Sequence, residues 1–150
     1  MKLLIPPPIV GLVCGAAMWG LSRQFPSTAI DFSLRPWVAL GLVMIGVLIE
    51  AISVYKFLKA KTTVTPLNPD KASSLVVSGL YRYSRNPMYL GMFALLTGWA
   101  LWLANPLSVL VLPIFVGYLT WFQIKPEEEA LAAKFGAEYS AYCQRVRRWL

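Results

Sequence analysis

The sequence contains no histidine and only two cysteines, Cys14 and Cys143, among its 150 residues. Most zinc sites need histidine or cysteine ligands, and Ser-His-Asp triads need a histidine base. No GxGxxG or P-loop glycine pattern occurs, so neither kind of nucleotide site is predicted. We therefore expect no metal site, and any catalysis has to proceed without a metal or a histidine base. The cysteines lie in an apolar block and in the C-terminal tail, so we expect no disulfide between them.

Charged residues are also scarce, at 14% of the chain against roughly a quarter in soluble domains. Hydrophobic residues make up 57%, and the mean hydropathy is +0.58. The apolar residues form four blocks, at 5–21, 36–58, 87–104 and 106–124. Because about 20 apolar residues cross a bilayer as a helix, we expect an all-α integral membrane protein with four transmembrane helices in a single domain, 1–150. The first block resembles a signal peptide, but its apolar core is long and no small-residue cleavage site follows, so we expect a retained helix.

Acidic residues number only 7 against 14 lysines and arginines, which leaves a formal net charge of +7. The basic residues gather between the second and third blocks and in the tail after the fourth. Loops rich in lysine and arginine stay in the cytoplasm, so both termini and the middle loop are expected there, in a multi-pass topology. Topology and attraction to anionic lipids account for this charge, and nucleic-acid binding is not predicted.

Two polar segments flank the third and fourth blocks, which are joined by a short turn at Asn105 and Pro106. One is SSLVVSGLYRYSRNPMYLG, at 73–91, and the other is KPEEEALAAKFGAEYSAY, at 125–142. The far ends of an antiparallel helical hairpin lie together. We therefore expect the RNPMY segment to lie beside Glu127 and Glu128.

Asn86 and Pro87 allow two interpretations. In one they start the third helix, since Asn is a favoured N-cap, Pro suits the first helical position, and Arg85 reaches the headgroups. In the other, the free backbone N–H groups and the positive end of the helix dipole bind a ligand carboxylate or phosphate. The residues alone favour neither.

The tail is open to two interpretations as well. Pro126 and the three acids after it suit the first turn of a capped surface helix. Acids beside anionic headgroups are unfavourable, which indicates a further role for them. Apolar residues at three- and four-residue spacing predict a cytoplasmic amphipathic helix against the membrane or the bundle, namely Leu131, Phe135, Tyr139, Tyr142 and Val146.

Glu50 lies near the middle of the second block, where a carboxylate is costly and usually faces a partner or a cavity. It is protonated, paired with a basic residue or part of a polar pocket, and pairing is the interpretation we favour. Gly11 and Gly15 form a GxxxG step, which predicts close helix packing.

Taken together, SGLYRYSRNPMYLG, the Asn105-Pro106 turn and EEEALAAKFGAEYSAYCQRV resemble the isoprenylcysteine carboxyl methyltransferase family and the related phospholipid methyltransferases. The resemblance covers about half of the chain, and its specificity lies in the order and spacing of the motifs around a membrane hairpin. It implies a membrane enzyme that uses S-adenosylmethionine and a lipophilic acceptor that enters from the bilayer between helices. Carried over to this sequence, the cofactor-binding residues are Ser73, Ser74, Leu75, Val76, Tyr81, Arg85, Asn86, Pro87, Met88, Tyr89 and Glu127.

The resemblance also implies catalytic and substrate-binding candidates. Arg85, Glu127 and Glu128 are the catalytic candidates, and Glu50 and Gln123 are the substrate-binding candidates. Gln123 stands where the family has its substrate-binding arginine, and Lys125 is a nearby cation that could replace it. Asn86 stands where the eukaryotic prenylcysteine enzymes have a histidine. The favoured acceptor is the carboxylate of an isoprenylated cysteine, and a phospholipid or another small lipophile is the alternative.

Two other classes remain as alternatives. A small transporter that couples protons or cations through Glu50 explains that residue, but not the acidic pair or the RNPMY segment. A non-catalytic membrane scaffold that packs through Gly11 and Gly15 predicts that Arg85 and Glu127 do not affect ligand binding. Neither the oligomeric state nor the full crossing of the bilayer by the first block follows from the sequence.

Overall fold

The structure, a computed structural model, describes residues 5–26, 32–59 and 75–150. Within these ranges every regular element is helical, which confirms the prediction of an all-α protein. The elements are α1 (Pro7–Gln24), α2 (Arg35–Lys59), the 3-10 helix η3 (Gly79–Arg82), α3 (Pro87–Leu103), α4 (Pro106–Val109), α5 (Val111–Leu119), the π-helix η4 (Thr120–Ile124) and α6 (Lys125–Arg145). Ser73 and Ser74 lie outside the described residues.

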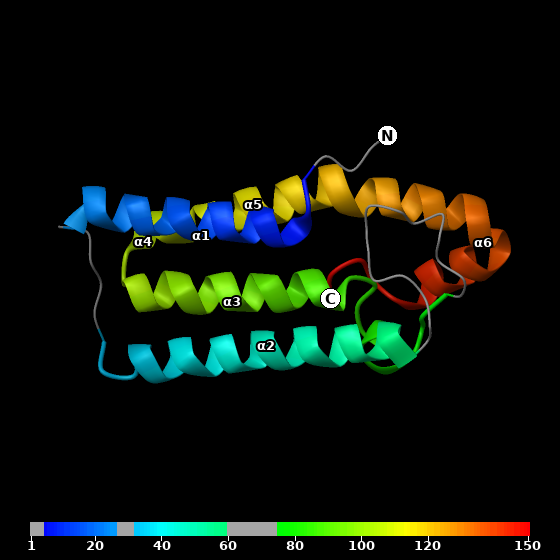
Figure 1. The fold of residues 1–150 in the computed structure, drawn as a ribbon, viewed down its shortest axis with the longest axis horizontal. Coiled ribbons are helices and arrows are strands. Elements are labelled where there is room, and N and C mark those ends of the chain that lie inside the picture. Colours follow the sequence, from blue (N-terminus) through cyan, green and yellow to red (C-terminus); the bar gives the residue numbers. More distant parts are fainter. Residues whose placement is uncertain (1–4, 27–31, 60–74) are drawn as a thin grey trace.

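The four apolar blocks form four antiparallel helical runs, which are α1, α2, α3 and the series α4–α5–η4. The start of α1, the end of α2 and the start of α3 therefore lie at one end of the bundle, where α5 continues into α6 (Figure 1). We call this the polar end. Among the described residues two helices are long and apolar enough to cross a membrane, namely α2 and the helix that runs from Pro106 to Arg145. The helix α3 is apolar but has 17 residues.

A tight turn joins α3 to α4, as the Asn105-Pro106 pair predicts. Ala104 adopts a left-handed conformation with φ 56°, and the Leu107 N–H donates to the Asn105 side-chain oxygen at 2.9 Å. The Asn105 side-chain nitrogen donates to the carbonyl of Phe25 just after α1, also at 2.9 Å. One buried residue thus closes the hairpin and ties it to α1.

Glycines bring α2 and α3 into direct backbone contact. A Cβ at Gly46 of α2 would stand 2.8 Å from the Gly91 carbonyl oxygen of α3, and a Cβ at Gly98 would stand 2.8 Å from the Ala39 carbonyl. The predicted close packing at Gly11 and Gly15 was wrong in its location, because a Cβ at either would meet side chains no closer than 3.4 Å. Small residues seal the α2–α3 interface, while α1 approaches α3 more loosely.

Pro126, Glu127 and Glu128 lie in the first turn of α6, as one interpretation predicts, but this turn is not the capped start of a separate helix. The residue before α6, Ile124, is already helical, with φ −66° and ψ −48°, so the chain continues from α5 through η4 into α6 without a free helix N-terminus. A proline inside a helix lacks the N–H that would bond four residues back and crowds that carbonyl. The wider π-turn at Thr120–Ile124 directly precedes this position, and such turns accommodate the distortion.

The second half of α6 turns back towards the bundle at Gly136, where φ is 49° and ψ is −118° (Figure 1). Glycine reaches this positive φ without a side-chain clash. The predicted apolar stripe of the tail forms one cluster, in which Tyr139, Tyr142 and Val146 are buried and Leu131, Phe135, Leu75 and Cys143 pack around them. The tail therefore packs on itself and on the segment before η3.

Candidate functional site

The polar end brings the RNPMY segment against the acidic pair, which confirms the main inference drawn from the hairpin. The Tyr89 hydroxyl donates to Glu127 Oε1 at 2.7 Å. The Arg85 guanidinium forms an ion pair with Glu128 Oε1 at 3.2 Å. Residues about 40 positions apart in the sequence thus form one polar cluster, held by the first turn of α3 on one side and by α6 on the other.

Arg85 lies at the centre of this cluster. Its backbone N–H donates to the Arg147 carbonyl at 2.9 Å, and one terminal guanidinium nitrogen donates to the free thiol of Cys143 at 2.6 Å. Its Nε is buried and makes no hydrogen bond with any described residue. A buried N–H without a partner is costly, so Arg85 holds an unused donor that suits an anionic ligand.

Asn86 occupies the N-cap position of α3 and Pro87 its first turn, as one of the two interpretations predicts. However, the Asn86 side chain does not cap the helix. Its amide nitrogen instead donates to the Arg148 carbonyl at 3.0 Å, and its backbone N–H donates to the Ser84 hydroxyl at 3.1 Å. The first-turn N–H groups of α3, including that of Met88, are therefore left without a side-chain cap and can meet a ligand.

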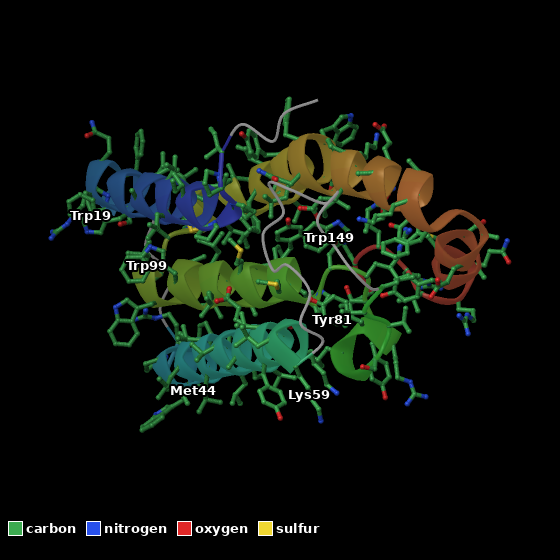
Figure 2. All side chains as sticks on the ribbon, turned by 45° about the vertical axis from the view of Figure 1, so that its right-hand side comes forward. Trp19, Met44, Lys59, Tyr81, Trp99 and Trp149 are labelled. Carbon is green, nitrogen blue, oxygen red and sulfur yellow. The ribbon has the colours of Figure 1, made fainter. Side chains whose placement is uncertain are left out.

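Residues 146–150 form part of the site, and the sequence reasoning missed them. This segment, which we call the C-terminal strap, returns from α6 to the start of α3 (Figure 1). Arg148 donates to both oxygens of Glu128, with Nε at 3.0 Å and a terminal nitrogen at 2.7 Å. The Trp149 indole donates to the Thr120 hydroxyl in η4 at 3.2 Å and packs against the core (Figure 2). Both oxygens of Glu128 are therefore occupied by arginines, so Glu128 holds Arg85 and Arg148 in position and is not a free acceptor for a ligand.

The other predicted cofactor residues surround the same cluster. Tyr81 is buried in η3, and its carbonyl accepts a hydrogen bond of 2.7 Å from the Tyr142 hydroxyl. Burial, with Tyr142 as its neighbour, raises the pKa of Tyr81, so this phenol stays protonated at neutral pH. Pro87 is fully buried, whereas Leu75, Val76 and Met88 are half-buried.

Gln123 is buried in η4, where its amide nitrogen donates to the Ile5 carbonyl before α1 and its oxygen has no partner among the described residues. It therefore links the start of α1 to the junction of η4 and α6. Lys125 is not directed to this position, because its ammonium lies 4.5 Å from the ring centre of the exposed Trp121. The structure thus gives no support to Lys125 as a substitute for the family arginine.

A cavity of about 730 Å³ opens between α1 and α2, with α3 as its floor. We call it the α1–α2 groove. Among the described residues its lining is apolar except for Glu50, which is the one charged residue that borders it. Gly11 and Gly15, together with Trp19 and Trp99 farther from the polar end, belong to the same lining (Figure 2). Glu50 forms no ion pair with a described residue, so the geometry favours the polar-pocket interpretation over the salt bridge.

The Glu127 carboxyl lies beyond the fourth apolar block, in α6. Burial is the main reason why its pKa rises from the ordinary 4.5 to about 8. The hydrogen bond from Tyr89 lowers the pKa, and the neighbouring negative charge of Glu128 raises it further. The unfolded chain releases this proton near pH 4.5 and the folded protein only near pH 8, so the folded protein binds the extra proton between these values. The stabilisation is complete below about pH 4.5 and is lost as the pH rises towards 8.

We therefore expect a pH-dependent difference in stability between the wild type and Glu127→Gln. Glutamine keeps an acceptor for Tyr89 but does not ionise, so the variant should gain apparent melting temperature relative to the wild type between about pH 5 and 8. Thermal unfolding of the detergent-solubilised proteins measures this. Glu129→Gln, at an exposed position, is the matched control. A difference that does not vary with pH would contradict the assignment of a buried, protonated carboxyl.

Together, the fold and the site define a helical protein with membrane-type helices and a polar cluster at one end of a hairpin. The family model of phospholipid methyltransferases matches residues 34–138, which include this hairpin and most of the cluster. The chain belongs to the phospholipid methyltransferase family, and the predicted resemblance is confirmed.

Similar proteins fall into two groups. The chain is 49% identical over 63 residues to an uncharacterised protein of Haemophilus influenzae, covering 42% of this chain and 100% of that one. It is 31% identical over 114 residues to a probable protein-S-isoprenylcysteine O-methyltransferase of Oryza sativa subsp. indica, covering 76% of this chain and 60% of the relative. It is 28% identical over 125 residues to a protein-S-isoprenylcysteine O-methyltransferase of Schizosaccharomyces pombe, covering 82% of this chain and 53% of the relative. The chain thus spans only a little over half of these two named enzymes.

Proposed function

We propose that the protein transfers a methyl group from S-adenosylmethionine to a lipid-like acceptor in the membrane. The observation that carries this proposal is the cluster at the polar end. There Arg85 keeps a buried, unused donor at Nε, beside an uncapped helix N-terminus and two acids. The family membership and the two named methyltransferase relatives support it.

The residues of the cluster fit the polar groups of this cofactor. Arg85 Nε and the first-turn N–H groups of α3 suit its carboxylate. Glu127 suits its ribose hydroxyls or its amino group, as a carboxyl that already accepts from Tyr89. Tyr81 and Tyr89 offer ring faces for an adenine or a cationic methyl group. Arg148 and Cys143 hold the Arg85–Glu128 pair in place.

Methyl transfer from this cofactor requires the protein mainly to position the two reactants. The bound cofactor supplies an electrophilic methyl group on a positively charged sulfur. The chain has to align the acceptor in line with that methyl group and exclude water, and such alignment supplies much of the catalysis. A carboxylate acceptor needs no general base, in keeping with a sequence that has no histidine. For an amine acceptor, an ionised Glu127 can take up the proton that is released.

The acceptor we favour is the carboxylate of an isoprenylated cysteine, as in the names of the relatives, with a phospholipid as the alternative. Support for a lipophilic acceptor comes from the apolar α1–α2 groove, which lies against α3. We further propose that the four helical runs all cross the bilayer and that the polar end faces the cytoplasm. The lysines at the end of α2, Lys56 and Lys59, favour that orientation.

Calorimetric titration of the purified protein with S-adenosylmethionine tests the proposal. We expect micromolar binding by the wild type and by Glu129→Gln, and a loss of at least about tenfold in Glu127→Gln. The positive charge of the cofactor favours the ionised form of Glu127, which accepts stronger hydrogen bonds, and glutamine cannot ionise. A folded wild type that binds no cofactor, with and without an isoprenylated cysteine analogue, would overturn the proposal.

A further inference from the structure

The α1–α2 groove is a site of mixed character, because one carboxyl borders an otherwise apolar wall. Its volume of about 730 Å³ lies within the range of about 300–1,000 Å³ that is usual for small-molecule sites. Gly15 of α1 and the floor residues Leu96 and Trp99 of α3 contribute apolar surface along the bundle axis. A hydrocarbon chain suits this surface, and a bilayer offers such chains in quantity.

Glu50 lies beside the part of α3 that enters the candidate site. A Cβ on Gly91 would be 2.8 Å from Glu50 Cγ, so the glycine leaves room for the acidic side chain. Gly91 follows Tyr89 by two residues, which is about 3 Å along a helix axis, and Tyr89 donates to Glu127. Glu50 thus lies at nearly the same height along α3 as Tyr89, on the face of α3 that packs against α2. The headgroup of a chain in the groove would reach this level of the bundle.

We propose that the α1–α2 groove holds the hydrocarbon chain of the methyl acceptor and that Glu50 accepts a hydrogen bond from a nitrogen in its headgroup. The inference rests on the proposed function and deepens it. A carboxylate repels an acidic headgroup and accepts from N–H groups, so Glu50 orients the headgroup with its nitrogen towards α2. The reacting group then faces away from Glu50, towards Arg85 and the start of α3.

An isoprenylated cysteine carries this chemistry, because its amide N–H is separate from the carboxylate that receives the methyl group. An aminophospholipid does not, because its nitrogen is itself the methyl acceptor and would be held away from the reacting position. A headgroup without nitrogen covers the half-buried Glu50 without giving it a hydrogen-bond donor, which costs binding. Glu50 is therefore a specificity-determining residue, with Gly91 as the residue that makes room for it.

The test compares two ligands that differ only in the acetamido group, which carries the N–H. N-acetyl-S-farnesylcysteine carries the chain, the carboxylate and the amide, whereas S-farnesylthiopropionic acid has the same chain and carboxylate without nitrogen. We expect the wild type, reconstituted in phosphatidylcholine nanodiscs, to bind the first about tenfold more tightly in calorimetry. Glu50→Met keeps an unbranched side chain that fits beside Gly91, and it should bind both ligands equally. Glu138→Gln, at an exposed position, is the matched control and should keep the preference.

A second pair of variants tests the groove itself. Gly15→Leu fills it, since the nearest atom to a Cβ there is 3.9 Å away, and it should weaken both ligands at least tenfold. Gly20→Leu lies on the same helix with no atom within 4 Å of its Cβ and should change neither affinity. Equal binding of both ligands by the wild type, a preference that survives in Glu50→Met, or full binding by Gly15→Leu would overturn the inference.

Two further measurements separate the sources of the ligand and the two proposals. Displacement of the bound analogue by phosphatidylethanolamine, but not by phosphatidylglycerol, would place a nitrogen that is itself the methyl acceptor at Glu50 and would overturn the proposed orientation. Lack of displacement by both lipids supports an isoprenylated cysteine. Titration with S-adenosylmethionine should give the same affinity in Glu50→Met as in the wild type. A wild type that fails to bind the cofactor but keeps the nitrogen preference refutes the methyltransferase proposal and leaves the groove as a lipid site.

Discussion

Arg85→Ala is expected to lower the affinity for S-adenosylmethionine by roughly a hundredfold, as for the loss of one partner from a buried charge pair. Arg85 carries the unused Nε and contacts Glu128 and Cys143, so its side chain connects the ligand side of the cluster to α6. Calorimetry on the purified variant measures the loss. The global fold should survive, because Glu128 keeps its two hydrogen bonds from Arg148.

Arg82→Ala is the control for this prediction, since Arg82 is an exposed arginine in η3, three residues before Arg85. Arg85→Lys is a sharper second variant, because lysine keeps the charge and loses the fork of donors. Wild-type affinity in both Arg85 variants would remove Arg85 from the cofactor site.

Release of the C-terminal strap is the second large effect that we expect. The double variant Arg148→Ala, Trp149→Ala loses the bidentate pair with Glu128 and the hydrogen bond to Thr120. It should lower the affinity for S-adenosylmethionine by roughly tenfold, because the strap carbonyls hold the Arg85 backbone and the Asn86 side chain. Hydrogen exchange should speed up at the Arg85 amide, which bonds to the strap.

Arg147→Ala provides the matched control for the strap. The Arg147 side chain is exposed, and only its carbonyl contributes to the site, so its truncation should leave both measurements unchanged. If the double variant exchanges and binds like the wild type, the strap is not needed to organise the site.

The fold and the pairing across the hairpin could be predicted from the sequence because they follow from composition and connectivity. Four apolar blocks separated by polar segments leave few alternatives to antiparallel helices. The Asn105-Pro106 turn is too short to let α3 and the next run separate, so Tyr89 and Glu127 had to lie together. These predictions used no contact between individual side chains.

The contacts of the C-terminal strap with the site could not be predicted from the sequence, for a physical reason. Its main contacts are backbone carbonyls, at Arg147 and Arg148, and every residue type has a carbonyl. The only sequence signal was a pair of arginines and a tryptophan placed after an amphipathic helix, where charge alone suggested lipid headgroups. The partner of the Asn86 side chain was not predictable for a related reason, since an asparagine side chain serves a helix cap or a neighbouring carbonyl equally well.

The continuity of α5, η4 and α6 was also beyond sequence reasoning. Pro126 is a standard signal for a helix start, and the π-turn before it lets the helix continue instead. The acids are thereby held on a helix that extends from the membrane-type segment, which fixes Glu127 relative to α3. A separate surface helix would leave this relation to a flexible joint.

The gap between α1 and α2 has a consequence for enzyme kinetics. A ligand that reaches the groove sideways from the lipid phase searches a surface rather than a volume, so its relevant concentration is its mole fraction in the membrane. Adding inert phospholipid at a fixed amount of acceptor should then lower the rate of methyl transfer, although the bulk concentration of every reactant stays the same. Rates for such an acceptor are comparable between preparations only at equal surface dilution.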